Sequence, residues 1–385
     1  MTDSPLRPVR LDLSGERLLA TYDVHGSTER TTSVLDQLVV EQTIEFPADL
    51  VPDDDIKRHI IGTVEQLDRL DNDRSRAVVS YAVELAGGQL PQLFNVLFGN
   101  ISLVPGVRLV DVQLPATLLE AFPGPRHGVP GLRQRFLPDG GPLLATALKP
   151  MGTPVDDLAA MAYDLAAGGI NLVKDDHSFG NQPFSTFRDR VPAIADAVRR
   201  ANDDRSEPSS IYLPALNLRA EDLDAGVELA VEAGVGGLLL LPGLISHDRM
   251  RAITDSLPED LVVMTHPSFL GQLVTDPTAG FAHGLLLGTF ARLCGADVTV
   301  FPNHGGRFSF TPETCTEVAS ACLAELGDLA TCWPAPGGGM SLERVGEMLR
   351  FYGEDVCLLI GGELYRGDIL TRTRQMVETI QEVRT

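Results

Sequence analysis

From residue 143 onward the chain alternates short apolar runs with amphipathic segments of helical length. Segments 154–167, 220–232 and 341–351 have the helical pattern. Runs that are apolar throughout are typical of parallel strands buried on both faces. Eight such runs in about 245 residues predict a (β/α)₈ TIM barrel, with a doubly wound open sheet as the alternative. The runs are 143–148, 170–173, 211–216, 237–241, 261–264, 298–301, 330–333 and 356–360.

The N-terminal part has a different pattern. Segments 17–23, 39–46, 77–85 and 107–113 are predicted strands, and 54–68 is a possible helix. This mixture predicts a smaller α+β domain of ferredoxin-like type. Segment 122–136 is dense in proline and glycine and is a plausible linker. We therefore expect an N-terminal domain over 1–136 and a catalytic barrel over 137–385.

Composition narrows the possible partners. The chain has 385 residues, is 44% hydrophobic and carries 31 basic against 53 acidic side chains, a formal charge of −22. A surface this acidic disfavours nucleic acid and anionic membranes, so any anionic ligand must be captured locally. No signal peptide or spanning segment is predicted, which favours a cytoplasmic protein. The five cysteines lack CxxC spacing and are predicted to be buried free thiols.

Polar residues and glycines follow the predicted strands, at the face where barrel active sites form. Lysine, aspartate and histidine in sequence suggest metal binding or proton transfer, an arginine suggests an anion grip, and glycines after the last two strands suggest a phosphate cradle. The alternatives are solvated loop charges, a structural ion pair and ordinary turn glycines. These candidates are Lys149, Lys174, Asp176, His177, His266, His304, Arg307, Gly337, Gly338, Gly361 and Gly362.

Several motifs resemble one known family. The run GGINLVKDDHSFGNQPFSTFRDR (168–190) resembles the active-site segment of the RuBisCO large subunit, and LKPMG (148–152) resembles its first-strand motif. LFNVLFGN (93–100) is similar to a segment of that family's N-terminal domain. The APGGGM and IGG runs stand where the family has its phosphate loops. The similarity keeps its order over most of the chain.

The resemblance implies a metal site. In that family the strand-2 lysine takes up CO₂ as a carbamate that binds Mg²⁺ with an aspartate and a glutamate. Carried over, the ligands are carbamylated Lys174, Asp176 and His177, which stands in place of the glutamate. Imidazole is a softer donor than Mg²⁺ normally takes, so Mg²⁺ is bound more weakly, Mn²⁺ or another divalent ion is used, or His177 acts as an acid or base.

Other departures from the family bear on the reaction. Arg307 falls near the flexible-loop lysine, Met151 replaces a lysine, and His266 matches a family histidine whose neighbouring arginine is Pro267 here. The chain thus resembles the non-carboxylating RuBisCO-like proteins, which form an enediolate without fixing CO₂.

The expected activity is C–C cleavage of a phosphorylated oxo-sugar acid by a decarboxylase or transcarboxylase/hydrolase. Alternatives are an enolase or isomerase of a (methylthio)keto-sugar phosphate, and a catalytically silent barrel with a binding or regulatory role.

The resemblance also implies an oligomer. Glu41 and Asn100 match the active-site glutamate and asparagine that a second subunit contributes in the family, so we expect at least a homodimer. Lys149 is expected to move a proton or stabilise charge. The family's threonine–tryptophan phosphate contact is replaced at Phe46 and Pro47, which favours a monophosphate substrate.

Overall fold

The chain forms two compact units. The computed structural model describes residues 6–205 and 210–384. One unit comprises the chain up to Pro123 together with Leu270–Leu286, and the other comprises Gly124–Phe269 and the chain from Leu287 onward. Among the described residues, no helix combines the length and apolar character needed to cross a membrane.

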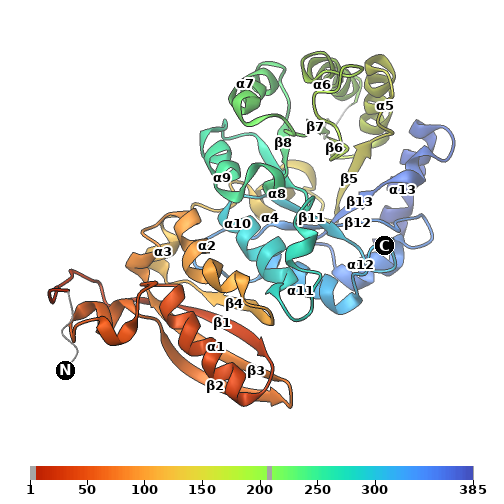
Figure 1. Ribbon diagram of the computed structural model, residues 1–385. Helices are drawn as coiled ribbons and strands as arrows, with labels where there is room; N and C mark the ends of the chain where they lie inside the picture. Colours follow the sequence, from red (N-terminus) through yellow and green to blue (C-terminus); the bar gives the residue numbers. More distant parts are fainter. Residues whose placement is uncertain (1–5, 206–209, 385) are drawn as a thin grey trace. The chain divides into compact units, whose positions relative to one another are not determined.

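The first unit is a five-stranded sheet in the order β10-β4-β1-β3-β2, whose β1-α1-β2-β3-α2-β4 succession confirms the ferredoxin-like expectation (Figure 1). Strand β1 pairs antiparallel with β3 and β4, and β10 runs parallel to β4. Its elements are β1 (Arg17–His25), α1 (Thr28–Glu41), η1 (Ala48–Leu50), η2 (Ile56–Ile60), β2 (Thr63–Asp71), β3 (Arg74–Ala82), η3 (Val83–Leu85), α2 (Leu90–Phe98), η4 (Asn100–Leu103), β4 (Val107–Gln113), α3 (Ala116–Leu119), η6 (Gly271–Leu273) and β10 (Gly280–Phe281).

Two N-terminal predictions are wrong. The predicted strand 39–46 begins inside α1, a helix capped by Ser27 that buries Val34, Leu35 and Leu38. The possible helix 54–68 is a short π-helical turn followed by β2, an edge strand exposed along its whole length. An exposed edge strand lacks the alternation that identifies a strand. The strands predicted at 17–23, 77–85 and 107–113 are confirmed by β1, β3 and β4.

The second unit confirms the predicted barrel. Its eight parallel strands run in the order β7-β6-β5-β13-β12-β11-β9-β8, and a bridge between Ala215 and Leu239 joins β7 to β8. Seven of the strands fall on the predicted runs, while β12 begins at Trp333, where the predicted run ended. The strands are β5 (Leu143–Leu148), β6 (Leu172–Asp175), β7 (Ile211–Leu213), β8 (Gly237–Leu240), β9 (Val262–Thr265), β11 (Val298–Pro302), β12 (Trp333–Gly337) and β13 (Cys357–Ile360).

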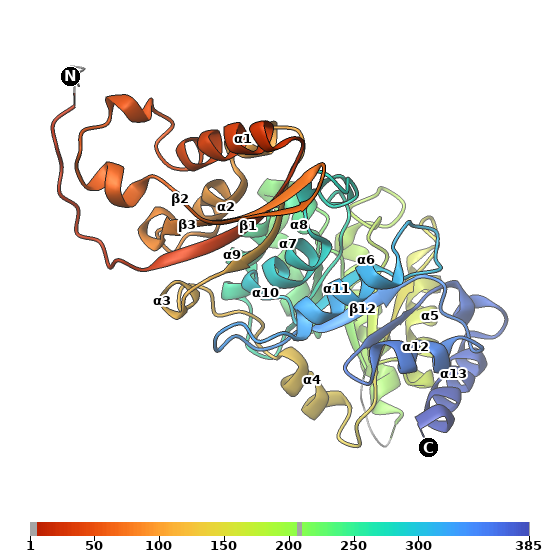
Figure 2. The same ribbon diagram turned by 90° about the horizontal axis from the view of Figure 1, so that it is seen from below.

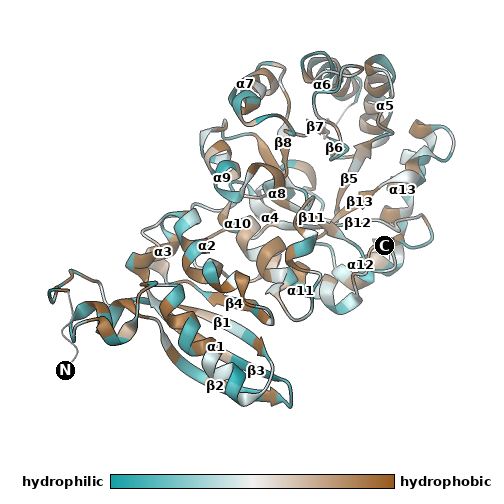
Figure 3. Ribbon diagram, in the orientation of Figure 1, coloured by the Kyte–Doolittle hydropathy of each residue, from teal (hydrophilic) through white to brown (hydrophobic). Residues whose placement is uncertain are grey.

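Helices surround these strands. Figure 3 shows hydrophobic residues along the strands and hydrophilic residues on the outer helices, and α5 packs beside α6 and α13 (Figures 1 and 2). They are α4 (Gly128–Phe136), α5 (Val155–Gly168), α6 (Phe187–Asp203), η5 (Ala220–Asp222), α7 (Leu223–Glu232), α8 (Pro242–Ile245), α9 (His247–Ser256), α10 (Phe290–Leu293), α11 (Pro312–Leu323), α12 (Val345–Tyr352), η8 (Gly362–Tyr365) and α13 (Ile369–Arg384); η7 (Leu285–Thr289) begins in the first unit.

Helix α4 occupies most of the segment expected to be a linker. Val129, Leu132 and Phe136 pack in one buried cluster with residues at the N-terminal ends of the barrel strands, including Leu143 and Trp333. The carboxylate of Asp297, which is fully buried, accepts hydrogen bonds from the backbone N–H groups of His127, Gly128 and Val263. Segment 128–136 therefore closes the bottom of the barrel, the face opposite the strand ends that carry the candidate residues.

Candidate active site

The carboxyl ends of β5 and β6 bring four of the predicted residues together. Ala147 pairs with Lys174 and Leu148 with Asp175, so Lys149 emerges beside Asp176. The Nζ atom of Lys149 lies 2.9 Å from Oδ2 of Asp176, and Nδ1 of His177 lies 3.2 Å from Oδ1. Asp176 is thus the centre of a small cluster at the barrel mouth.

Asp176 is held in its ionised form. Burial by itself would raise the pKa of its carboxyl, but hydrogen bonds from Lys149 and Ser178 outweigh burial and leave the pKa well below its usual range. The backbone N–H of Ser178 donates to Oδ1 at 3.1 Å and the Ser178 hydroxyl donates at 2.9 Å. This carboxylate is an anionic oxygen donor throughout the neutral pH range.

Lys174 is almost inaccessible, with 2% of its surface exposed. Its Nζ donates to the backbone oxygen of Asp175 at 3.1 Å. Burial, supported by the positive charge of Lys149 and opposed by Asp176, lowers the pKa of Lys174 to about 8. The whole sequence contains only three lysines, Lys57, Lys149 and Lys174, so two of the three are in this cluster. Arginine cannot supply a neutral nitrogen nucleophile, whereas a buried lysine can.

Two imidazoles stack beside this cluster. The rings of His177 and His266 are parallel within 8°, with centroids 4.2 Å apart. Burial and nearby cations lower both pKa values, that of His266 well below its usual value. The Nδ1 atom of His266 accepts from the backbone N–H of Ser268 at 3.2 Å. Neutral His266 therefore carries its proton on Nε2 and can donate it to a ligand.

Arg307 lies within electrostatic range of the cluster. Its charge is among those that lower the pKa of His177, and its guanidinium stands 5.9 Å from the Phe308 ring centroid. The base of its loop is fixed by Asn303, which is fully buried and accepts from the Tyr352 hydroxyl at 2.7 Å. His304 instead packs against the ring of Phe351, 4.7 Å between centroids, so it belongs with α12 rather than with the cluster.

Different structural features explain why glycine stands at each of the candidate phosphate-binding positions. A Cβ on Gly337, the last residue of β12, would lie 3.0 Å from the Leu359 side chain, so packing explains this glycine. Gly338 has φ +103°, a conformation that glycine adopts readily, and a Cβ there would contact nothing within 4 Å. A Cβ on Gly361 or Gly362 would also contact nothing within 4 Å. At these three positions a ligand can approach the backbone closely.

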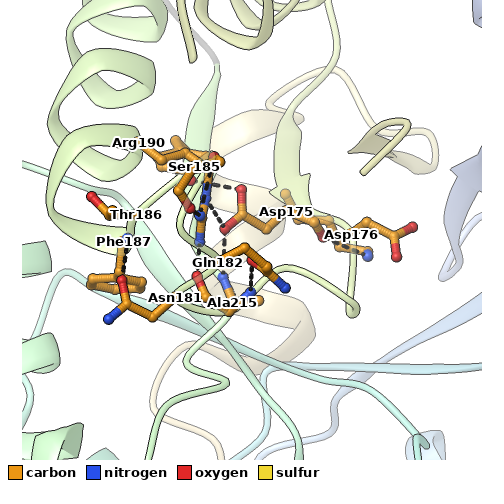
Figure 4. Close-up of polar contacts among 12 residues, drawn as sticks. Asp175, Asp176, Asn181, Gln182, Ser185, Thr186, Phe187, Arg190 and Ala215 are labelled. Carbon is orange, nitrogen blue, oxygen red and sulfur yellow. Dashed lines mark hydrogen bonds and ion pairs between the residues drawn. The ribbon is translucent and has the colours of Figure 1, made fainter. Parts of the chain in front are cut away.

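A buried ion pair supports the loop after β6 (Figure 4). Arg190 and Asp175 have no exposed side-chain surface, and Nε of Arg190 lies 3.2 Å from Oδ2 of Asp175. The Tyr212 hydroxyl donates to Asp175 at 2.7 Å and the Ala215 N–H donates at 3.1 Å. Arg190 also donates to the backbone oxygens of Gly180, at 2.9 Å, and of Ser185. The arginine therefore holds the chain that follows Asp176, while Figure 4 shows the Asp176 side chain turned away from it.

Glu41 and Asn100 are brought together within the first unit. The Asn100 amide donates to Oε2 of Glu41 at 3.3 Å. Between them, buried Gln42 donates to the backbone oxygens of Asn95 and Val96 and accepts from the Ile101 N–H at 2.8 Å. The two side chains thus form a pair on a fixed backbone.

The donor set fits a hard divalent cation only with a modified lysine. Among the described residues there is no group of three or more His, Cys, Asp or Glu side chains suited to a metal. Asp176 and His177 offer one oxygen and one nitrogen 3.2 Å apart, and the pKa of Lys174, about 8, gives an amine that can react with CO₂. A carbamate on Lys174 would supply the missing anionic oxygen. The five cysteines are buried free thiols, as predicted.

Sequence reasoning did not identify the supporting residues. Ser178 and Ser268 each follow a site residue by two positions, and this spacing is a local signal for hydrogen bonds back to Asp176 and His266. The Arg190–Asp175 pair spans 15 residues, and the Tyr365 hydroxyl bonds Ala147, 218 residues away; neither spacing matches a local hydrogen-bonding pattern.

Known proteins resemble this chain over most of its length. Residues 128–303 match the family described as ribulose bisphosphate carboxylase large chain, catalytic domain. Ribulose bisphosphate carboxylase-like protein 1 of Rhodopseudomonas palustris is 38% identical over 354 residues, 92% of this chain and 94% of that protein. The 5-methylthioribulose-1-phosphate isomerase of Rhodospirillum rubrum is 37% identical over 350 residues, 91% of each. A crystal structure of a Rubisco-like protein from R. palustris has a TM-score of 0.85 at 36% identity, covering 95% of this chain and 98% of that one.

Proposed function

We propose that this chain, which belongs to the RuBisCO large-chain family and has RuBisCO-like proteins among its relatives, forms an enediolate from a phosphorylated oxo-sugar acid and cleaves a C–C bond. The reaction is a decarboxylation, or a carboxyl transfer with hydrolysis, and not CO₂ fixation. The observation that carries the proposal is local charge. Lys149 pairs with Asp176, and Lys149, Lys174 and Arg307 all act electrostatically on His177, on a chain whose net charge is −22. A cationic mouth on an acidic protein selects an anionic small molecule.

The change to histidine favours a substrate with an extra negative charge. Where the family has a glutamate, His177 is neutral because burial lowers its pKa. With this neutral donor, the site has one negative charge fewer than the family pattern. A substrate carboxylate in addition to a phosphate restores that charge, and Arg307 offers planar bidentate binding to it. This arrangement favours an oxo acid over an uncharged keto-sugar chain.

Lys174 as carbamate, Asp176 and His177 would hold Mg²⁺ or another divalent cation such as Mn²⁺. The cation, when bound, lowers the barrier to an enediolate by polarising a substrate carbonyl. Lys149 moves the proton or stabilises the developing charge, since its ammonium is already at the Asp176 carboxylate. His266 donates a hydrogen bond from Nε2 to a substrate oxygen. The backbone N–H groups of Gly338, Gly361 and Gly362 hold the phosphate, with Gly337 setting the end of β12.

A second copy of the chain completes the site. Five segments that follow barrel strands, four loops and helix α8, each expose a large apolar side chain, and a contiguous group of such side chains is typical of a protein–protein contact. Glu41 and Asn100 form a hydrogen-bonded polar pair. The cluster of described residues around Asp176 at the barrel mouth contains no such glutamate–asparagine pair. A homodimer in which this pair meets the barrel mouth of the partner accounts for both observations. The exposed residues are Met151, Phe184, Leu244, Phe269 and Phe308, 44–67% exposed.

A second candidate is isomerisation or enolisation of a methylthio-keto-sugar phosphate without cleavage. A relative that covers nine tenths of the chain is named 5-methylthioribulose-1-phosphate isomerase, and others are named 2,3-diketo-5-methylthiopentyl-1-phosphate enolase. Both reactions share the enediolate, so the same lysines and histidines would serve.

A substrate panel tests the proposal. Purified protein with bicarbonate and Mg²⁺ or Mn²⁺ is given phosphorylated oxo-sugar acids and keto-sugar phosphates, and products are followed by mass spectrometry and CO₂ release. We expect loss of CO₂ from an oxo acid. An isomer of unchanged mass would favour the second candidate. A protein that retains no divalent metal and incorporates no solvent deuterium into any compound would be a catalytically silent barrel.

A further inference from the structure

The short segment that follows β13 is attached to β5 at both ends. At its start, Ile360 pairs with Thr146, and the Thr146 hydroxyl donates to the Ile360 backbone oxygen at 2.7 Å. At its end, the Tyr365 hydroxyl donates to the Ala147 backbone oxygen at 2.8 Å. Gly361 and Gly362 lie between these two attachments. The segment that carries the two glycines is therefore connected directly to β5, the strand that Lys149 follows.

The Tyr365 hydroxyl also lies near the backbone N–H of Lys149. Burial raises the pKa of Tyr365, while the Thr146 side chain and the Lys149 backbone N–H, which are in hydrogen-bonding range, lower it. The net direction is upward, so Tyr365 keeps its proton and remains a donor. The Tyr365 hydroxyl thus contacts β5 two residues before Lys149. It also fixes the C-terminal end of the segment that contains Gly361 and Gly362.

The outer side of the segment is fixed separately. Glu363 forms ion pairs with Arg366, at 3.3 Å, and with Arg372 of α13, and Leu364 is fully buried. These contacts hold the segment to α13 and balance the negative charge of Glu363. They do not connect the segment to Lys149, a connection that comes from Tyr365 and Thr146.

We propose that Tyr365 is a positioning residue that sets the distance between the phosphate-holding N–H groups of Gly361 and Gly362 and the amine of Lys149. The inference rests on the proposed function, because it assumes that phosphate binds at these glycines. A displacement of about 1 Å between a binding group and a reacting group can reduce a rate by up to about a hundredfold. Tyr365→Phe keeps the ring and removes only the hydroxyl.

Pyridoxal 5′-phosphate measures this distance without any knowledge of the substrate. Its phosphate binds the glycine cradle, and the Lys149 amine attacks its aldehyde carbon with loss of water to form an imine. Added borohydride then reduces the C=N bond to a stable secondary amine. Because the chain has only three lysines, peptide mass spectrometry separates the labels at Lys149, at buried Lys174 and at exposed Lys57, which serves as an internal standard.

The matched control is Tyr163→Phe, which removes a hydroxyl that donates to Asp204 at 2.6 Å on the outside of the barrel. We expect Tyr365→Phe to slow labelling of Lys149 on the order of tenfold relative to Lys57. Tyr163→Phe should not slow it, and inorganic phosphate should compete with the label equally well in both variants. Labelling of Lys149 at the wild-type rate in Tyr365→Phe would overturn the inference.

A second variant and turnover give independent readouts. Thr146→Val removes the hydrogen bond at the other end of the segment and should slow labelling in the same direction. With a substrate from the panel, Tyr365→Phe should lower kcat without raising KM, and should have no further effect in a Lys149→Ala background. Equal losses in both backgrounds would indicate a general structural role and refute the positioning role. If the wild type turns over no substrate, the proposed function fails, while labelling still decides the role of Tyr365.

Discussion

The buried pair of Asp175 and Arg190 should contribute strongly to the stability of the barrel. Asp175→Asn keeps the size of the side chain but removes the charge that faces Arg190, both side chains having no exposed surface. Removal of one partner from a buried ion pair typically lowers the free energy of unfolding by about 3–5 kcal/mol, because the other charge stays buried without compensation. This is a large share of the roughly 5–15 kcal/mol that stabilises a typical domain.

The single tryptophan provides the assay. Trp333 is fully buried at the start of β12, so its fluorescence during urea titration reports on the barrel alone. At a slope of roughly 1–3 kcal/mol per molar urea, the predicted loss moves the midpoint by about 1 M or more. Asp196→Asn is the control, since Asp196 also faces arginines, Arg199 and Arg200, but on an exposed helix surface. This variant should unfold like the wild type.

A double variant separates charge from packing. Asp175→Asn combined with Arg190→Met removes both charges and should recover part of the lost stability, because no uncompensated ion remains. The reasoning is refuted if Asp175→Asn shifts the urea midpoint no more than Asp196→Asn does. It is also refuted if the double variant loses more free energy of unfolding than the two single variants lose together.

Three further predictions concern the chemistry of the site. The pKa of Lys174, about 8, means that roughly a tenth of this amine is neutral at pH 7. At constant dissolved CO₂ the rate of carbamate formation should therefore rise with pH and level off above pH 8, and Lys174→Arg should form no adduct. A rate that still rises at pH 10 would contradict this prediction. His177→Glu should strengthen Mg²⁺ binding on the order of tenfold, measured by calorimetry with bicarbonate present, whereas unchanged affinity would show that His177 is not a ligand. Arg307→Gln should raise KM for an oxo acid about tenfold or more and leave KM for a keto-sugar phosphate nearly unchanged, and equal effects would exclude a contact with the carboxylate.

The barrel was predictable because its strands are buried on both faces and appear as short continuous apolar runs. The exception was β12, whose sequence WPAPG contains Pro334 and Pro336. Proline is rare inside sheets, so the pattern placed the strand too early. In the first unit, the strand predicted at 39–46 failed because apolar residues at the end of α1 continue into the following turn.

The site was predictable to the extent that it follows the chain. Lys149, Asp176 and His177 are at strand ends, and the register of neighbouring parallel strands brings such residues together. The stacking of His177 on His266 depends on the relative height of β6 and β9, which no local pattern encodes. The attachment of Tyr365 to Ala147 likewise joins the two ends of the barrel sequence.

The position of α4 has a consequence for how the gene could be divided. A fragment that begins at residue 137 would lack Val129, Leu132 and Phe136. The apolar residues at the N-terminal ends of the barrel strands, which these three side chains cover, would then be exposed to water. A fragment that begins at Gly124 keeps this cover. Even so, residues 270–286 leave the barrel sequence to join the N-terminal sheet, where β10 pairs with β4. The two units are therefore interleaved along the chain, and no single cut yields both of them whole.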